Sequence, residues 1–95
     1  MASRKLLTAE EITQRLSQYP AWDTNGKMLS RDFEFKDFKE AFAFLSKVAL
    51  IAESLGHHPE IWNVYNKVTL KLSTHDTQPA GGGLTDFDFD FIKAL

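Results

Sequence analysis

The sequence has 95 residues, the length of one small domain, which we expect to span residues 1–95. It contains no cysteine, so disulfides, thiolate metal sites and cysteine nucleophiles are excluded. Its formal charge of −2 and scattered basic residues argue against direct nucleic-acid binding, and no apolar run approaches the ~18 residues of a membrane span. Without a signal-like start, we expect a cytoplasmic protein, with the nucleus as an additional location.

The first third of the chain predicts a helix followed by a hairpin. Thr8 and Glu11 have the T-x-x-E spacing of a capping box, and Pro20 predicts where the helix has ended. Asn25-Gly26 is the strongest short hairpin signal, because both residues tolerate positive φ. Trp22 is expected in the strand before this turn. The strand after it is predicted by a mostly apolar face at period two, in which Leu29, Phe33 and Phe35 alternate in phase with Arg31.

The longest predicted helix occupies the middle of the chain. Asp37 and Glu40 offer a capping pair, and apolar residues then recur every three or four positions from Phe38 to Leu55. Gly56 predicts a left-handed cap at its end. The apolar stripe is wider than a helix covering a sheet requires. The helix is therefore either deeply buried or packed with its second face against another subunit.

A second hairpin and a short helix complete the chain. We expect a strand over Ile61–Tyr65, a tight turn at Asn66-Lys67, and an alternating strand from Val68. After a loop, Thr85 and Asp88 repeat the capping box of the first helix. The predicted order is α-β-β-α-β-β-α. It favours an α+β fold in which a four-stranded antiparallel sheet has three helices packed on one face.

The three histidines are the candidate catalytic residues. His57 and His58 precede one strand of the second hairpin and His75 follows the other, so antiparallel pairing should gather them at one sheet edge. For any one of them alone, an idle solvated loop histidine is the simpler interpretation. Together they favour general acid–base catalysis, because an unperturbed imidazole titrates at about 6.5 and can exchange protons at neutral pH.

A metal site is the alternative use of such a cluster. Imidazole is a common zinc ligand, and Glu53 lies one helical turn before the histidine pair. Adjacent histidines point apart, however, and lack the i, i+4 spacing of a helical metal pair. We therefore expect no metal.

The stretch "AESLGHHPEIWNVYNKVTLKLSTHD" resembles the signature of the pterin-4a-carbinolamine dehydratase family. "RDFEFKDFKEAFAFLSKVALIAE" before it and "GGLTDFDF" after it resemble the same family, so the resemblance runs from about Leu7 to the last helix. It implies dehydration of 4a-hydroxytetrahydrobiopterin to quinonoid dihydrobiopterin in tetrahydrobiopterin recycling. It also implies that the enzyme needs no metal and no further cofactor.

The resemblance assigns site residues. His57, His58 and His75 match the three active-site histidines; we expect His57 and His75 to transfer protons and His58 to hold the pterin, without assigning acid and base. The positions that match substrate contacts are these histidines with Gly56, Pro59, Ser73, Thr74, Asp76 and Trp22.

Three features depart from the family's pattern. Gly56 stands where many relatives have Asp or Asn, so a polar contact is missing or the glycine is simply a better helix cap. The loop from Asp76 to Gly83 is longer than usual, and the last helix is shorter.

The resemblance also implies partners. Members form homodimers and homotetramers, which we expect here through the central helix. Animal members bind a homeodomain transcription factor through the same helix. The alternative function is therefore a protein-interaction module, with a transcription factor or other protein as partner.

Overall fold

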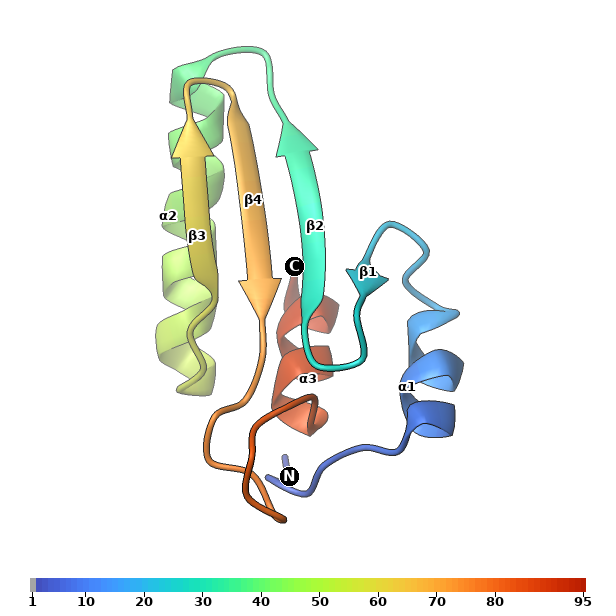
Figure 1. Cartoon of the computed structure of the whole chain (residues 1–95). Helices are drawn as coiled ribbons and strands as arrows, with labels where there is room; N and C mark the ends of the chain where they lie inside the picture. The colour runs from blue at the N-terminus through green and yellow to red at the C-terminus, as the bar shows by residue number, and fades with distance from the viewer. Residues whose placement is uncertain (1) are drawn as a thin grey trace.

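The computed structural model describes residues 2–95 and has the element order expected from the sequence (Figure 1). The sheet is antiparallel throughout, with strand order β1-β2-β4-β3. Two hairpins, β1–β2 and β3–β4, are therefore joined through their inner strands. The elements are α1 (Ala9–Leu16), β1 (Asp23–Thr24), β2 (Leu29–Glu34), α2 (Phe38–Leu55), β3 (Glu60–Val64), β4 (Lys67–Leu72) and α3 (Asp86–Ala94).

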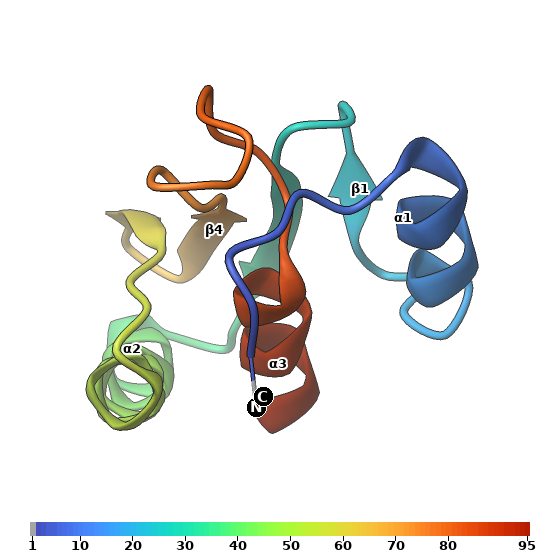
Figure 2. The same cartoon turned by 90° about the horizontal axis from the view of Figure 1, so that it is seen from below.

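The core lies between the sheet and the helices. Figure 2 shows α2 and α3 on the same side of the sheet, with α1 beside β1. In the central β2–β4 pair Leu29 lies opposite Leu72, and both are fully buried with Leu70. Phe91 of α3 and Val48 of α2 close the same cluster. The apolar periodicities of the strands and helices thus meet in one layer, as an α+β arrangement requires.

Both predicted capping boxes form. The Thr8 hydroxyl accepts a hydrogen bond from the Glu11 N–H, and the Glu11 carboxylate accepts one from the Thr8 N–H. The Thr8 backbone bond lowers the pKa of the Glu11 carboxyl below its usual value. Helix α1 ends at Leu16, with Ser17 as its cap, so it stops before Pro20 could interrupt it. Pro20 is therefore not the residue that ends the helix, which stops before it is reached.

Two strand boundaries differ from the expectation. Trp22 immediately precedes β1, which begins at Asp23, and it is buried in the core. The tight turn of the second hairpin is at Tyr65-Asn66, one residue earlier than predicted, because Tyr65 adopts a φ of 51° and Lys67 already belongs to β4. The Asn66 side chain then donates to the Phe35 carbonyl (2.8 Å), which ties this turn to the end of β2.

Apolar side chains remain exposed on two elements. Phe38, Phe42 and Leu50 lie on α2 with 48%, 53% and 74% of their surface exposed. Others lie on the edge strand β3 and the turn after it, namely Ile61, Trp62, Val64 and Tyr65. Only the exposed stripe on α2 was anticipated from the sequence. Among residues 2–95, no helix combines the length and apolar character needed to cross a membrane.

Gly56 ends α2 in the left-handed conformation, with φ 62° and ψ 32°. The Ala52 carbonyl accepts hydrogen bonds from the N–H groups of Gly56 and His57, so the chain turns sharply into the histidine pair. A Cβ at Gly56 would meet no atom within 4 Å, so only the backbone conformation opposes a side chain.

We expect Gly56→Ala to lower the free energy of unfolding by ~1 kcal/mol, because alanine disfavours this conformation. Gly56→Asn should cost clearly less, because asparagine tolerates it. Urea unfolding of both variants against the parent protein checks this. Equal losses for the two variants would contradict the backbone explanation.

Candidate active site

The histidines lie at one end of the β3–β4 hairpin. His57 and His58 follow α2 and precede β3, whereas His75 lies three residues beyond the end of β4. Glu60 pairs with Lys71, so the start of β3 and the end of β4 are adjacent. Figure 1 shows both segments at the same end of the sheet, where α3 also begins. The topology therefore brings the two histidine-bearing segments to one region, as expected from the sequence.

His57 is the most enclosed of the three histidines, and it has a carboxylate partner. Its Nε2 lies 2.6 Å from Oδ1 of Asp88, on the first turns of α3. Only 11% of the His57 side chain is exposed, and none of the Asp88 side chain is. The imidazole also packs beside the Phe87 ring, with centroids 5.7 Å apart. This short contact between His57 and Asp88 has the geometry of a strong, charge-assisted hydrogen bond.

Asp88 is held by a buried network of its own. Its Oδ2 accepts hydrogen bonds from the Thr74 hydroxyl (2.8 Å) and from the Thr85 N–H (3.0 Å). The Thr74 hydroxyl has a single proton, which it donates to Asp88. In the 2.7 Å contact between the Thr74 and Thr85 hydroxyls, Thr85 must therefore be the donor. The Thr85 oxygen in turn accepts from the Phe87 N–H. Among residues 2–95 no buried side-chain polar atom lacks a partner.

This network fixes the chemistry of His57. In its neutral form the imidazole has one N–H, and the adjacent carboxylate requires that proton to be on Nε2. Nδ1 is then the nitrogen with the free lone pair. A proton accepted there produces an imidazolium that Asp88 stabilises. The arrangement is therefore suited to a base supported by a buried carboxylate.

Sequence reasoning recognised Asp88 only as the capping partner of Thr85. The capping role is real, but the same carboxylate also binds His57. The sequence held one usable signal, because a helix beginning at the histidine end of the sheet places its N-terminal acidic residues there. That signal does not distinguish Asp88 from Asp86 or Asp90.

His58 and His75 are both exposed. His58 Nε2 lies 2.7 Å from Oε2 of Glu53, with 63% and 79% of the two side chains exposed. Glu53 was considered as a metal ligand. Within residues 2–95 no three His, Asp or Glu side chains gather in a way that could hold a metal ion. His75 makes no side-chain hydrogen bond within the same residues.

The other expected contact residues have diverse surroundings. Trp22 packs edge-on against Phe33 in the core, at 6.2 Å between centroids. Thr74 is buried, and its hydroxyl is occupied by Asp88 and Thr85. Asp76 is exposed and pairs with Arg4. Pro59 and Ser73 are half-buried beside the histidines in sequence, and Gly56 forms the helix cap.

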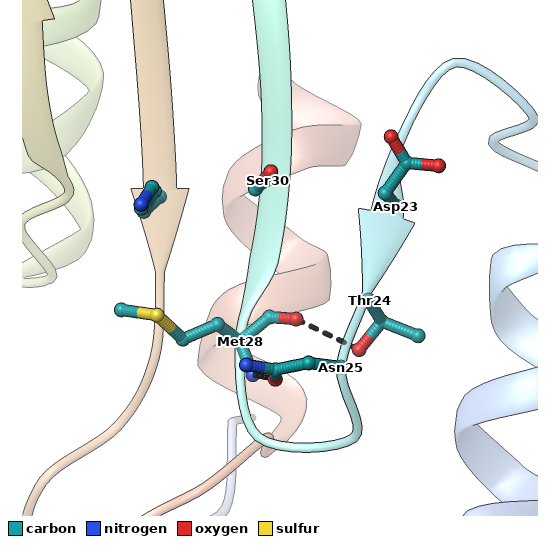
Figure 3. A pocket seen from close by; sticks show the side chains of 6 residues that line it. Asp23, Thr24, Asn25, Met28 and Ser30 are labelled. Atoms are coloured by element: carbon teal, nitrogen blue, oxygen red, sulfur yellow. Dashed lines mark hydrogen bonds between the residues drawn. The ribbon is translucent and has the colours of Figure 1, made fainter.

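A separate polar hollow lies near the β1–β2 hairpin (Figure 3). It has a volume of about 250 Å³ and is lined by Asp23, Thr24, Asn25, Met28, Ser30 and Lys71. Local turn contacts shape it, since the Thr24 hydroxyl donates to the Met28 carbonyl at 2.7 Å. None of the histidines lines this hollow.

Comparisons with known proteins agree on a family. The family model described as pterin 4 alpha carbinolamine dehydratase matches residues 5–95. A putative pterin-4-alpha-carbinolamine dehydratase from Prochlorococcus marinus is 45% identical over 92 residues, covering 96% of this chain and 91% of the relative. Another from Sulfurisphaera tokodaii is 43% identical over 91 residues, covering 96% of this chain and 94% of the relative.

A solved structure extends the likeness to three dimensions. The crystal structure of a transcriptional coactivator/pterin dehydratase from Brucella melitensis superimposes with a TM-score of 0.81 at 38% identity. The match covers 92% of this chain and 90% of the other. Sequence and fold therefore place this chain in the pterin-4-alpha-carbinolamine dehydratase family.

Proposed function

We propose that this protein dehydrates 4a-hydroxytetrahydrobiopterin to quinonoid dihydrobiopterin and water, as a step of tetrahydrobiopterin recycling. The observation that carries the proposal is the buried Asp88–His57 pair at the same end of the sheet as His58 and His75. Family membership supplies the substrate class, and the pair supplies a proton acceptor.

The reaction requires two proton transfers. The N5 proton leaves, the C4a–O bond breaks, and the departing hydroxyl receives a proton to become water, while a double bond forms between N5 and C4a. We assign acceptance of the N5 proton to Nδ1 of His57, because Asp88 stabilises the resulting imidazolium. The proton for the leaving hydroxyl is assigned to His75, the other histidine expected to transfer protons.

His58 has a different assigned role. Its Nε2 is engaged by Glu53 at the surface, so a contact from the remaining nitrogen would hold the pterin without transferring a reacting proton. Thr74 and Thr85 support Asp88 rather than the substrate. Ser73, Asp76, Gly56 and Pro59 remain the proposed lining around the three imidazoles.

The direct test follows the decay of freshly prepared 4a-carbinolamine with the purified protein. Acceleration well above the buffer-catalysed rate, unchanged after dialysis against a chelator, supports the proposal. A decay rate equal to that of buffer alone would refute it. Loss of activity on chelation that returns with added zinc would support the metal alternative.

A second proposal concerns assembly. The exposed stripe of Phe38, Phe42 and Leu50 on α2 suits association with a second copy of the chain, as a homodimer or homotetramer. The Brucella melitensis relative is called a transcriptional coactivator, so a transcription factor or another protein is the alternative occupant. Self-association is preferred because a stripe of this kind can be covered by the same helix of another copy.

We expect Phe42→Glu to shift the protein from an oligomer to the mass of one chain, because a carboxylate in an apolar contact loses its hydration. Light scattering after size exclusion measures this. Thr13→Glu, on the exposed side of α1, is the matched control and should leave the mass unchanged. A parent protein that is already monomeric at micromolar concentration would contradict self-association.

A further inference from the structure

The segment before α1 runs along the loop that carries His75. Residues 3–7, here called the N-terminal strap, lie next to the loop of residues 73–84 in both Figure 1 and Figure 2. The Leu6 N–H donates to the Gln78 carbonyl (3.0 Å), and the Gln78 N–H donates to the Arg4 carbonyl (2.9 Å). A third bond joins the Leu7 N–H to the Leu84 carbonyl (2.9 Å). The strap therefore supplies backbone partners to a loop that has no helix or strand of its own.

Glycines let the loop fold back against the strap. Gly83 exchanges two backbone hydrogen bonds with Thr74, at 2.8 and 2.9 Å. These bonds join the residue before His75 to the end of the loop that follows it. A Cβ on Gly83 would lie 2.8 Å from Cδ2 of Leu6. The strap is thus packed directly onto the loop, and any other residue at position 83 would require the Leu6 side chain to move.

One side chain of the strap connects both halves of the histidine site. Nε of Arg4 lies 3.0 Å from Oδ2 of Asp76, the residue after His75. The Arg4 guanidinium also lies over the Phe87 ring, 5.2 Å from its centroid, and Phe87 packs beside His57. Arg4 therefore touches the neighbour of His75 on one side and the neighbour of His57 on the other.

We propose that Arg4 is a positioning residue, which holds the His75 loop in place relative to His57 before the pterin binds. Arg4 acts through Asp76 and Phe87 and does not itself exchange protons with the substrate. The identity of the substrate rests on the proposed function, whereas the ordering of the loop does not. The strap is then a part of the site contributed by residues that precede the first helix.

The expected size of the effect follows from the two contacts. An ion pair between exposed side chains and an exposed cation–π contact are each weak, so their loss should change the equilibrium constant between the ordered and the open loop by about three- to tenfold. Apparent substrate affinity falls in proportion to the competent fraction. Once the pterin is bound, the loop is ordered again. KM should therefore rise, by at most that factor, while kcat changes little.

The test compares Arg4→Met with Arg15→Met. Arg15 makes the same two kinds of contact elsewhere, an ion pair with Asp86 (2.8 Å) and a cation–π contact with Phe89 (5.7 Å). Neither of these contacts involves the His75 loop. Two readouts are taken for each variant: amide hydrogen exchange at Gln78 and Gly83, and the separate values of kcat and KM for carbinolamine dehydration.

We expect Arg4→Met to speed exchange at both amides by about three- to tenfold and to raise KM by no more than that factor, with kcat within about twofold of the parent. Arg4→Lys keeps a positive charge for Asp76, so its exchange rates and KM should lie between those of Arg4→Met and the parent. Arg15→Met should match the parent in both readouts. Unchanged exchange in Arg4→Met, or equal effects of Arg4→Met and Arg15→Met, would overturn the proposal. If the parent protein has no dehydratase activity, the proposed function fails, and the exchange comparison still decides the role of Arg4.

Discussion

Replacing either His57 or His75 by alanine should slow carbinolamine dehydration by about 10²–10⁴-fold, the usual contribution of a positioned proton transfer. The loss should appear mainly in kcat, because the missing group acts on protons that move in the transition state. His58→Ala should raise KM more than it lowers kcat, since His58 is assigned to holding the pterin. Stopped-flow measurements on freshly generated substrate separate the two parameters.

The three histidine variants also serve as controls for one another. His58 and His75 are exposed, so their removal should leave the thermal unfolding midpoint close to that of the parent. His57 is enclosed and bonded to Asp88, so His57→Ala should unfold at a lower temperature. Near-parental kcat in both His57→Ala and His75→Ala would show that the proton transfers are wrongly assigned.

The second large effect is expected for Asp88→Asn. The change keeps the size of the side chain, but an amide can donate its own N–H to Nε2 of His57 and so favour the opposite tautomer. We expect kcat to fall by roughly 10²-fold or more and stability to fall by about 1–3 kcal/mol, because a buried charge-assisted bond is lost. The measurements are kcat, urea unfolding and the ¹⁵N NMR signals of the His57 ring.

Asp90→Asn is the matched control for this variant. It makes the same chemical change two residues away on α3, at an exposed position, and should leave kcat unchanged. In the parent protein the NMR signals should show the proton of neutral His57 on Nε2, and in Asp88→Asn on Nδ1. An activity loss without a change of tautomer would mean that Asp88 contributes only through folding.

Local signals explain why much of the fold could be predicted. The two capping boxes and the left-handed glycine at the end of α2 depend on backbone hydrogen bonds between near neighbours, which the sequence displays directly. The turn at Tyr65-Asn66 was misplaced by one residue because tyrosine rarely adopts positive φ. Its position depends on the Asn66 bond to Phe35, far away in the sequence.

The candidate site was predictable only in part, for a related reason. That His57, His58 and His75 approach one end of the sheet follows from antiparallel pairing alone. Which acidic residue supports His57 depends on how α3 packs against the segment that follows β4, where Thr74 bonds to Asp88. That docking buries Asp88 and leaves Asp90 in solvent, although both belong to the same alternating Asp-Phe stretch. The contact between the N-terminal strap and the His75 loop likewise needs the path of the chain before α1.

The measurement that tests the account most directly is a crystal structure with bound 7,8-dihydrobiopterin, a stable analogue without the 4a-hydroxyl group. We predict that the bicyclic ring lies between the imidazoles of His57 and His75, each within hydrogen-bond reach of about 3.2 Å from the ring system. A pterin bound in the hollow lined by Asp23, Ser30 and Lys71, or one that contacts neither imidazole, would contradict the account.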